Sequence, residues 1–159
     1  PTDYRWHFVG QLQSNKVKSV LRYASVVHSL DRPSLLSAIA KEVTQQRVEN
    51  PNYELGVFIQ LNLTEDENRG GIHPSRLLDF ATQVSSVAGL RLLGVMAVGS
   101  LDQTPEHDFE VVRAASQSLR ASFPSAKYIS AGMSEDFETA IKYGATHLRI
   151  GTAITGNRA

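Results

Sequence analysis

Cysteine is absent from this chain of 159 residues. Without thiols the chain can form neither disulfides nor thiolate metal sites, and nothing in it requires an oxidising compartment. An excess of charge of one sign is missing too, because 16 basic and 16 acidic side chains cancel to a formal net charge of +0. The composition therefore predicts no electrostatic attraction to nucleic acid or to an anionic membrane.

Long hydrophobic runs are also lacking, since no apolar stretch approaches the ~20 residues that cross a bilayer. The first residues, PTDYRWHF, do not have the basic-then-apolar layout of a signal peptide. No spacing in the chain matches a zinc site, a Walker loop, a dinucleotide fingerprint or a nucleophile elbow. We expect a cytoplasmic protein with no nucleic-acid or membrane partner, and the sequence does not define its oligomeric state.

What is present is an ordinary globular composition, with 42% hydrophobic and 20% charged residues. We expect one domain over residues 1–159, which is long enough to bury a core. Apolar segments alternate strictly with segments of helical spacing, and this alternation predicts parallel βαβ units. The predicted strands cover residues 6–10, 26–30, 56–63, 90–98, 127–130 and 147–151, with a helix after each of the first five.

Six units do not complete a barrel. A closed (β/α)₈ barrel needs eight and is seldom shorter than about 200 residues. An open six-stranded sheet would instead have two edge strands that need cover, and the sequence does not obviously supply it. The predicted fold class is therefore α/β, a TIM-type (β/α)₈ barrel with about six of its eight βα units in this chain.

Glycine and hydroxyl residues follow the last two predicted strands: Gly132 and Ser134 after one, Gly151 and Thr152 after the other. In barrels a phosphate commonly lies at the last two βα loops. Glycine lets backbone amides approach an anion, and a hydroxyl adds a donor. Arg149 adds a cation on the same strand. Ordinary strand-to-helix turns with capping residues explain these spacings equally well.

Five histidines allow several interpretations. His7, on the first predicted strand, points into a ligand pocket or packs as a core histidine. His28 is expected among loop and helix-cap residues, whereas His73 and His107 are expected to be solvated at helix starts. His147 is expected at the amino end of its strand, where it would serve stability.

Five segments together resemble the pyridoxal phosphate homeostasis protein family. They follow the family's order and spacing over residues 6–158: WHFVGQLQSNKVK at 6–18, HSLDR at 28–32, IQLNLTEDENRGGI at 59–72, LLGVMAV at 92–98 and SAGMSEDFETAIKYGATHLRIGTAITG at 130–156. The resemblance implies an alanine racemase N-terminal-domain-like barrel that binds pyridoxal 5′-phosphate (PLP). It also implies a protein that buffers or delivers PLP without established turnover.

Carried over by motif, the cofactor-binding residues include Met133 and Ser134 of the GMS turn, with Ser134 bonded to the phosphate. Gly151 and Thr152 would complete the phosphate cup, and Arg149 would face the pyridine nitrogen. A guanidinium donates and never accepts, so it would leave that nitrogen unprotonated and the ring a poor electron sink. Together with His7, these residues are the candidate site, and no metal or catalytic residue is predicted.

The sequence departs from the family in three ways. Ala131 replaces a methionine, and Arg69 replaces a lysine. The family's Schiff-base lysine belongs to a first strand that we expect upstream of this chain. The five lysines present do not replace it, because four are predicted on helices and one at the amino end of a strand: Lys16, Lys18, Lys41, Lys142 and Lys127.

Two alternatives stay open at this stage. One is a PLP-dependent amino-acid racemase-like enzyme on the same barrel, although a racemase generally takes a second acid/base residue from a partner domain. The other is a barrel that binds a different phosphorylated small molecule through the same cup.

Overall fold

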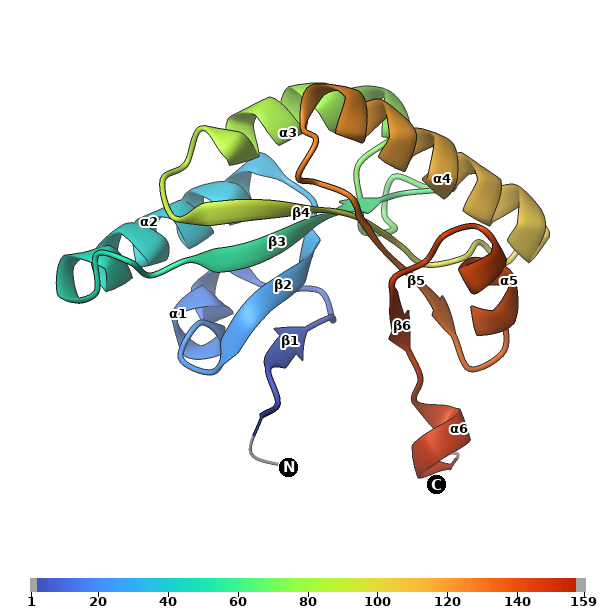
Figure 1. Cartoon of the computed structure of the whole chain (residues 1–159), viewed down its shortest axis with the longest axis horizontal. Coiled ribbons are helices and arrows are strands. Elements are labelled where there is room, and N and C mark those ends of the chain that lie inside the picture. The colour runs from blue at the N-terminus through green and yellow to red at the C-terminus, as the bar shows by residue number, and fades with distance from the viewer. Residues whose placement is uncertain (1–2, 157–159) are drawn as a thin grey trace.

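The computed structural model describes residues 3–156. Six strands form one parallel sheet, and their order in the sheet is their order in the chain. The strands are β1 (Trp6–Phe8), β2 (Ala24–Leu30), β3 (Leu55–Leu61), β4 (Leu90–Ala97), β5 (Tyr128–Met133) and β6 (His147–Arg149). The sheet curls so that its two edge strands, β1 and β6, face each other across the open side of the curl (Figure 1). The prediction of six βα units of a barrel is confirmed.

Helices follow the strands, and the longer ones cover the convex side of the curl (Figure 1). They are α1 (Val17–Val20), α2 (Pro33–Glu49), α3 (Leu77–Ser85), α4 (Pro105–Ser122), α5 (Phe137–Lys142) and α6 (Thr152–Thr155), with 3₁₀ turns at Ser14–Lys16 and Pro74–Arg76. Helix α4 begins after the N-cap residue Thr104, whose side chain accepts a hydrogen bond from the His107 amide at 3.3 Å. Among the described residues, no helix is long and apolar enough to cross a membrane.

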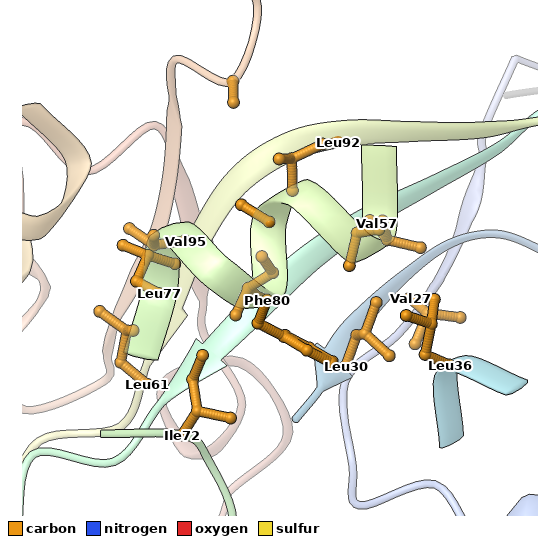
Figure 2. Packing of buried hydrophobic residues seen from close by; sticks show 14 of the residues in the cluster. Val27, Leu30, Leu36, Val57, Leu61, Ile72, Leu77, Phe80, Leu92 and Val95 are labelled. Carbon is orange, nitrogen blue, oxygen red and sulfur yellow. The ribbon is translucent and has the colours of Figure 1, made fainter. Parts of the chain in front are cut away.

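The main core lies between the convex face of the sheet and these helices. Alternate residues of β3, Leu55, Val57, Ile59 and Leu61, all belong to this core and are buried. Figure 2 shows strand and helix side chains meeting there, with Phe80 of α3 close to Leu30 of β2. Because the period of a strand is two, the intervening residues of β3 face the inside of the curl.

Strand β1 differs from the predicted strand 6–10 because it lies at the edge of the sheet. It is shorter and is not buried, since Trp6 is 58% exposed on a strand with a neighbour on one side only. The helical segment after β1 covers only residues 14–20, whereas α2 runs from Pro33 through Glu49. Leu78 is 39% exposed because it lies one position off the buried stripe of α3.

Candidate functional site

The carboxyl end of β5 is shaped by a glycine. Strand β5 runs to Met133, three residues beyond the predicted end, and Gly132 within it has a φ of +97°. A Cβ at Gly132 would lie 2.7 Å from the Cβ of Ala140 and 3.1 Å from Leu148. Glycine is therefore required here so that α5 can pack on the strand, which is a different reason from the predicted approach of an anion.

The turn after β5 contacts the start of α6. The Met133 amide donates to Asp136 Oδ1 at 2.6 Å, which fixes the turn. The Ser134 hydroxyl oxygen accepts from the Ala153 amide at 3.2 Å. Ser134 and Thr152 are thereby brought to the same end of the sheet, as the sequence predicted for a phosphate cup.

Gly151 differs from Gly132 in what surrounds it. Its φ of −115° is open to any residue, and a Cβ added there would meet no atom within 4 Å. The fold of the chain therefore does not require glycine at this position. Gly151 and Thr152 are exposed, so a group from outside could approach both backbone amides.

Arg149 is the cation of this end of the sheet. Its Nη2 donates to the carbonyl oxygen of Ala97 on β4 at 2.6 Å, whereas Nη1 is buried without a hydrogen-bond partner. Burial lowers the pKa of the guanidinium, and the nearby Asp136 carboxylate opposes that shift. The guanidinium is thus held in place through Nη2, whereas Nη1 keeps a donor that is not used.

A cavity of about 510 Å³ lies at the carboxyl ends of the strands, within the size range of small-ligand sites. Its lining comes from every part of this face: Val9, Gly10, Gln11, Gln60, Leu61, Asn62, Leu63, Asn68, Arg69, Gly70, Met96, Val98, Met133 and Arg149. Met133 and Arg149 are therefore placed together in one cavity. Ser134, Gly151 and Thr152 are not among the lining residues, and none of the five lysines lines it either.

Two larger surface clefts are less suitable. They measure about 770 and 600 Å³, and helix residues line both, with His107 of α4 in the first and Asp79 of α3 in the second. Neither is lined by any of the predicted site residues, and acidic side chains outnumber arginines in both. A phosphate-bearing ligand would meet like charge there, so the cavity at Arg149 is the better candidate.

The histidines are arranged in a way that sequence spacing did not reveal. His7 does not line the cavity, because its Nδ1 lies 2.9 Å from Nε2 of His28 on the inner face of the sheet. His28 lies within β2, as the predicted strand 26–30 requires, but it is 2% exposed on the inner face, so the loop or helix-cap role expected for this polar group is wrong for His28. His147 begins β6, but it pairs with Ser130 in the middle of β5 and faces other rings. The sequence does not give the strand register, and only the register shows that these three histidines lie close together.

A curled parallel sheet with a ligand-sized cavity at its carboxyl ends defines an incomplete α/β barrel of the ligand-binding kind. The family described as alanine racemase, N-terminal domain, matches residues 3–159. The chain belongs to this family and, within it, to the pyridoxal phosphate homeostasis proteins.

Three relatives illustrate the match. The pyridoxal phosphate homeostasis protein of Corynebacterium glutamicum is 39% identical over 158 residues, which are 98% of this chain and 72% of that protein. The corresponding protein of Mycobacterium tuberculosis is 38% identical over 157 residues, 96% of this chain and 61% of that protein. The chain thus spans about three fifths of the length of that relative.

The structure of PipY from Synechococcus elongatus, solved with PLP bound, superposes with a TM-score of 0.83 at 26% identity. The superposition covers 97% of this chain and 71% of PipY. The sequence-based assignment to this family is confirmed.

Proposed function

We propose that this chain binds PLP in the cavity at Arg149 and that the protein buffers or delivers the cofactor. The observation that carries the proposal is the buried Nη1 of Arg149, which has no partner at the wall of a cavity of about 510 Å³. A buried donor left unpaired is unfavourable, and a ligand acceptor would relieve it. The names of the relatives and the PLP bound to PipY support PLP as that ligand.

Arg149 is proposed to contact the pyridine nitrogen. When bound, PLP supplies an electron sink, which requires a protonated ring nitrogen to be effective. A guanidinium can only donate a hydrogen bond, so Arg149 would hold that nitrogen unprotonated. This pairing favours binding without turnover, and we infer storage or delivery of PLP rather than racemase-like catalysis.

Ser134, Gly151 and Thr152 are proposed to hold the phosphate. The Ser134 oxygen already accepts from the Ala153 amide, so its O–H remains available to donate. An anion can reach the backbone amides of Gly151 and Thr152, because the space beside Gly151 is open. The hydroxyl of the exposed Thr152 is a further donor. Met133 is proposed to contact the bound ring, because it lines the cavity beside Arg149.

The phosphate contacts are tested by titrating PLP and inorganic phosphate into the chain and its Thr152→Val variant. We expect at least tenfold weaker binding of both, about 1.4 kcal/mol, because the variant keeps the shape and loses the hydroxyl. Thr82→Val is the matched control, since Thr82 is exposed on α3 and bonds only the Leu78 carbonyl oxygen. Equal affinity in Thr152→Val and in the control would exclude the cup.

The Arg149 contact is tested in the same titration with Arg149→Met. Hydrogen bonds to charged groups contribute about 1.5–3 kcal/mol, so PLP affinity should fall by roughly tenfold to a hundredfold. Arg91→Met removes an exposed arginine of β4 and should leave affinity unchanged. Should inorganic phosphate or a sugar phosphate bind more tightly than PLP, the site would instead belong to another phosphate-bearing molecule. The cytoplasmic location stays a prediction, which cell fractionation would test.

A further inference from the structure

Three histidines and one serine meet on the inner face of the curled sheet. Nδ1 of His28 on β2 lies 2.8 Å from Oγ of Ser130 on β5, and Nε2 of His28 lies 2.9 Å from Nδ1 of His7 on β1. The ring of His147 on β6 stacks on His7 with centroids 6.0 Å apart. We call His7, His28, His147 and Ser130 the inner histidine cluster.

Two of these contacts, His28 with Ser130 and His7 with His147, join strands that are not neighbours. Strands β3 and β4 separate β2 from β5 in the sheet, and β1 and β6 are its opposite edges. The two edge strands face each other across the open side in Figure 1. The hydrogen bond between His28 and Ser130 and the stack of His7 on His147 can form only while the sheet is curled. The cluster is thus a brace across the curl.

The surroundings of the cluster favour its uncharged form. Burial lowers the pKa of His28 to about 3, with smaller effects in the same direction from His7, His147 and Arg149. Burial also lowers the pKa of His7, helped by His147 and Arg5, and burial lowers the pKa of His147.

The groups that face the cluster are cationic or neutral. They are Arg5 before β1, Phe58 of β3, Tyr128 of β5 with Lys127 beside its ring, and Arg149 of β6. No carboxylate of the described residues contributes to the three pKa shifts. A proton taken up by the cluster therefore creates a charge without a counter-ion.

The hydrogen bonds themselves limit protonation. A neutral imidazole has one donor and one acceptor nitrogen, so a single direction of donation can run through Ser130, His28 and His7. Protonation of both His28 and His7 would place two N–H groups against each other at 2.9 Å. The first proton taken up places a positive charge inside the curl. A second proton, on the other histidine of the pair, breaks the hydrogen bond between His28 and His7.

The strands of the brace also carry the ligand cavity. On β5, Ser130 of the cluster stands three positions before Met133, and on β6, His147 stands two positions before Arg149. Met133 and Arg149 both line the cavity. Separation of β6 from β1 would therefore move the cavity wall.

We propose that the inner histidine cluster is an acid-sensitive brace of the half-barrel. Uncharged, it holds the edge strands together; protonated below neutral pH, it lets the curl open and the cavity lose its ligand. The claim that the cluster stabilises the curl depends only on the contacts of the cluster. The claim that acid releases a ligand rests also on the proposed function.

The direction of the pH effect follows from linkage. Folded-state pKa values below the ordinary 6.5 mean that the unfolded chain binds more protons as the pH falls. The stabilising contribution is complete above about pH 6.5 and is lost progressively below it. With its pKa at about 3, His28 stays neutral at pH 5.5 and by itself lowers the folding constant by about tenfold between pH 7.5 and 5.5. The lowered pKa values of His7 and His147 add to this loss in the same direction.

The first test is urea unfolding of the 159-residue chain at pH 7.5 and 5.5. We expect the folding constant to fall by more than tenfold, and to fall less in the double variant His7→Gln with His147→Gln, which keeps only the contribution of His28. The control double variant, His73→Gln with His107→Gln, removes two exposed histidines and should keep the full pH dependence. Equal stability of the unmodified chain at both pH values would overturn the brace.

The second test needs no variant and so does not depend on a variant folding. Histidine ring protons are followed by NMR from pH 8 to 5 in the unmodified chain. The ring protons of His28 should keep the chemical shifts of the neutral form until the chain unfolds. Reversible titration of His7, His28 and His147 near pH 6.5 in a folded chain would refute the proposal.

The release of ligand is measured with PLP itself. PLP affinity should fall from pH 7.5 to 5.5 more steeply in the unmodified chain than in His7→Gln with His147→Gln, which shares any titration of PLP. Equal slopes would exclude coupling of the brace to the cavity. Absence of PLP binding at both pH values would defeat the proposed function, while unfolding and NMR would still decide the brace.

Discussion

The two faces of the curled sheet are built from different residues. On the convex face, side chains from β2 to β5 join the helices in one large apolar core. On the inner face, the buried apolar cluster consists of Val26, Phe58, Leu93 and Met96. Buried polar side chains, among them His28 and Ser130, share that inner face. Neighbouring residues of one strand thus belong to two environments.

The difference separates stability from binding. Apolar burial contributes roughly 25 cal/mol per Å² without regard to direction, which suits a face that only has to hold helices. Polar groups inside a protein need partners with defined geometry, which suits a face that must recognise a ligand or respond to protons. We therefore expect substitutions on the convex face to act on stability alone.

The largest effect should come from a truncation on the convex face. Ile59→Ala removes a fully buried side chain of β3 and leaves a cavity, so the free energy of unfolding should fall by about 2–5 kcal/mol. Leu101→Ala, at a side chain that is 91% exposed, should change it by less than about 0.5 kcal/mol. Urea unfolding measures both, and similar values for the two variants would break the comparison.

A smaller effect should distinguish the two glycines at the binding end. Gly132→Ala forces a Cβ against Ala140 at a positive φ, so it should destabilise the chain by about 1–3 kcal/mol. Gly151→Ala meets no atom and should stay within about 0.5 kcal/mol. Urea unfolding compares their stabilities, and a PLP titration should show weaker binding for Gly151→Ala. A large stability loss in Gly151→Ala would mean that Gly151 also serves the fold.

The smallest effect concerns a helix on the convex face. Thr104→Ala removes the hydroxyl that accepts from the His107 amide, which should lower the free energy of unfolding by about 1 kcal/mol. Thr44→Ala, on the exposed side of α2, is the control, since its hydroxyl bonds only the Ala40 carbonyl oxygen. Thermal unfolding of the two variants should show a lower midpoint temperature for Thr104→Ala only. Equal midpoints would mean that the Thr104 cap does not stabilise the chain.

The six βα units, and the end of the sheet that carries the candidate site, could be predicted from the sequence. Apolar runs such as that in β3 and helical spacing such as that in α4 are local patterns, so they are visible in one chain. The candidate cup residues were predicted because their types follow strands at that end of the sheet, and the cup stays a prediction. Exposure of Trp6, the cross-sheet bond of His28 and the unpaired Nη1 of Arg149 depend on register and curl. Those are properties of the assembled sheet.

The strand order has a consequence for how the chain assembles. Because β1 to β6 follow one another in the sheet, each strand can pair with its predecessor as soon as it is synthesised. Each such pairing closes a shorter loop than the contact between His28 and Ser130, and shorter loops cost less entropy to close. The bond between His28 and Ser130 spans 102 positions and must wait until β3, β4 and β5 are in place. We expect a folding intermediate in which the convex core is formed and the inner histidines are still solvated, with closure of the curl as the last and slowest step.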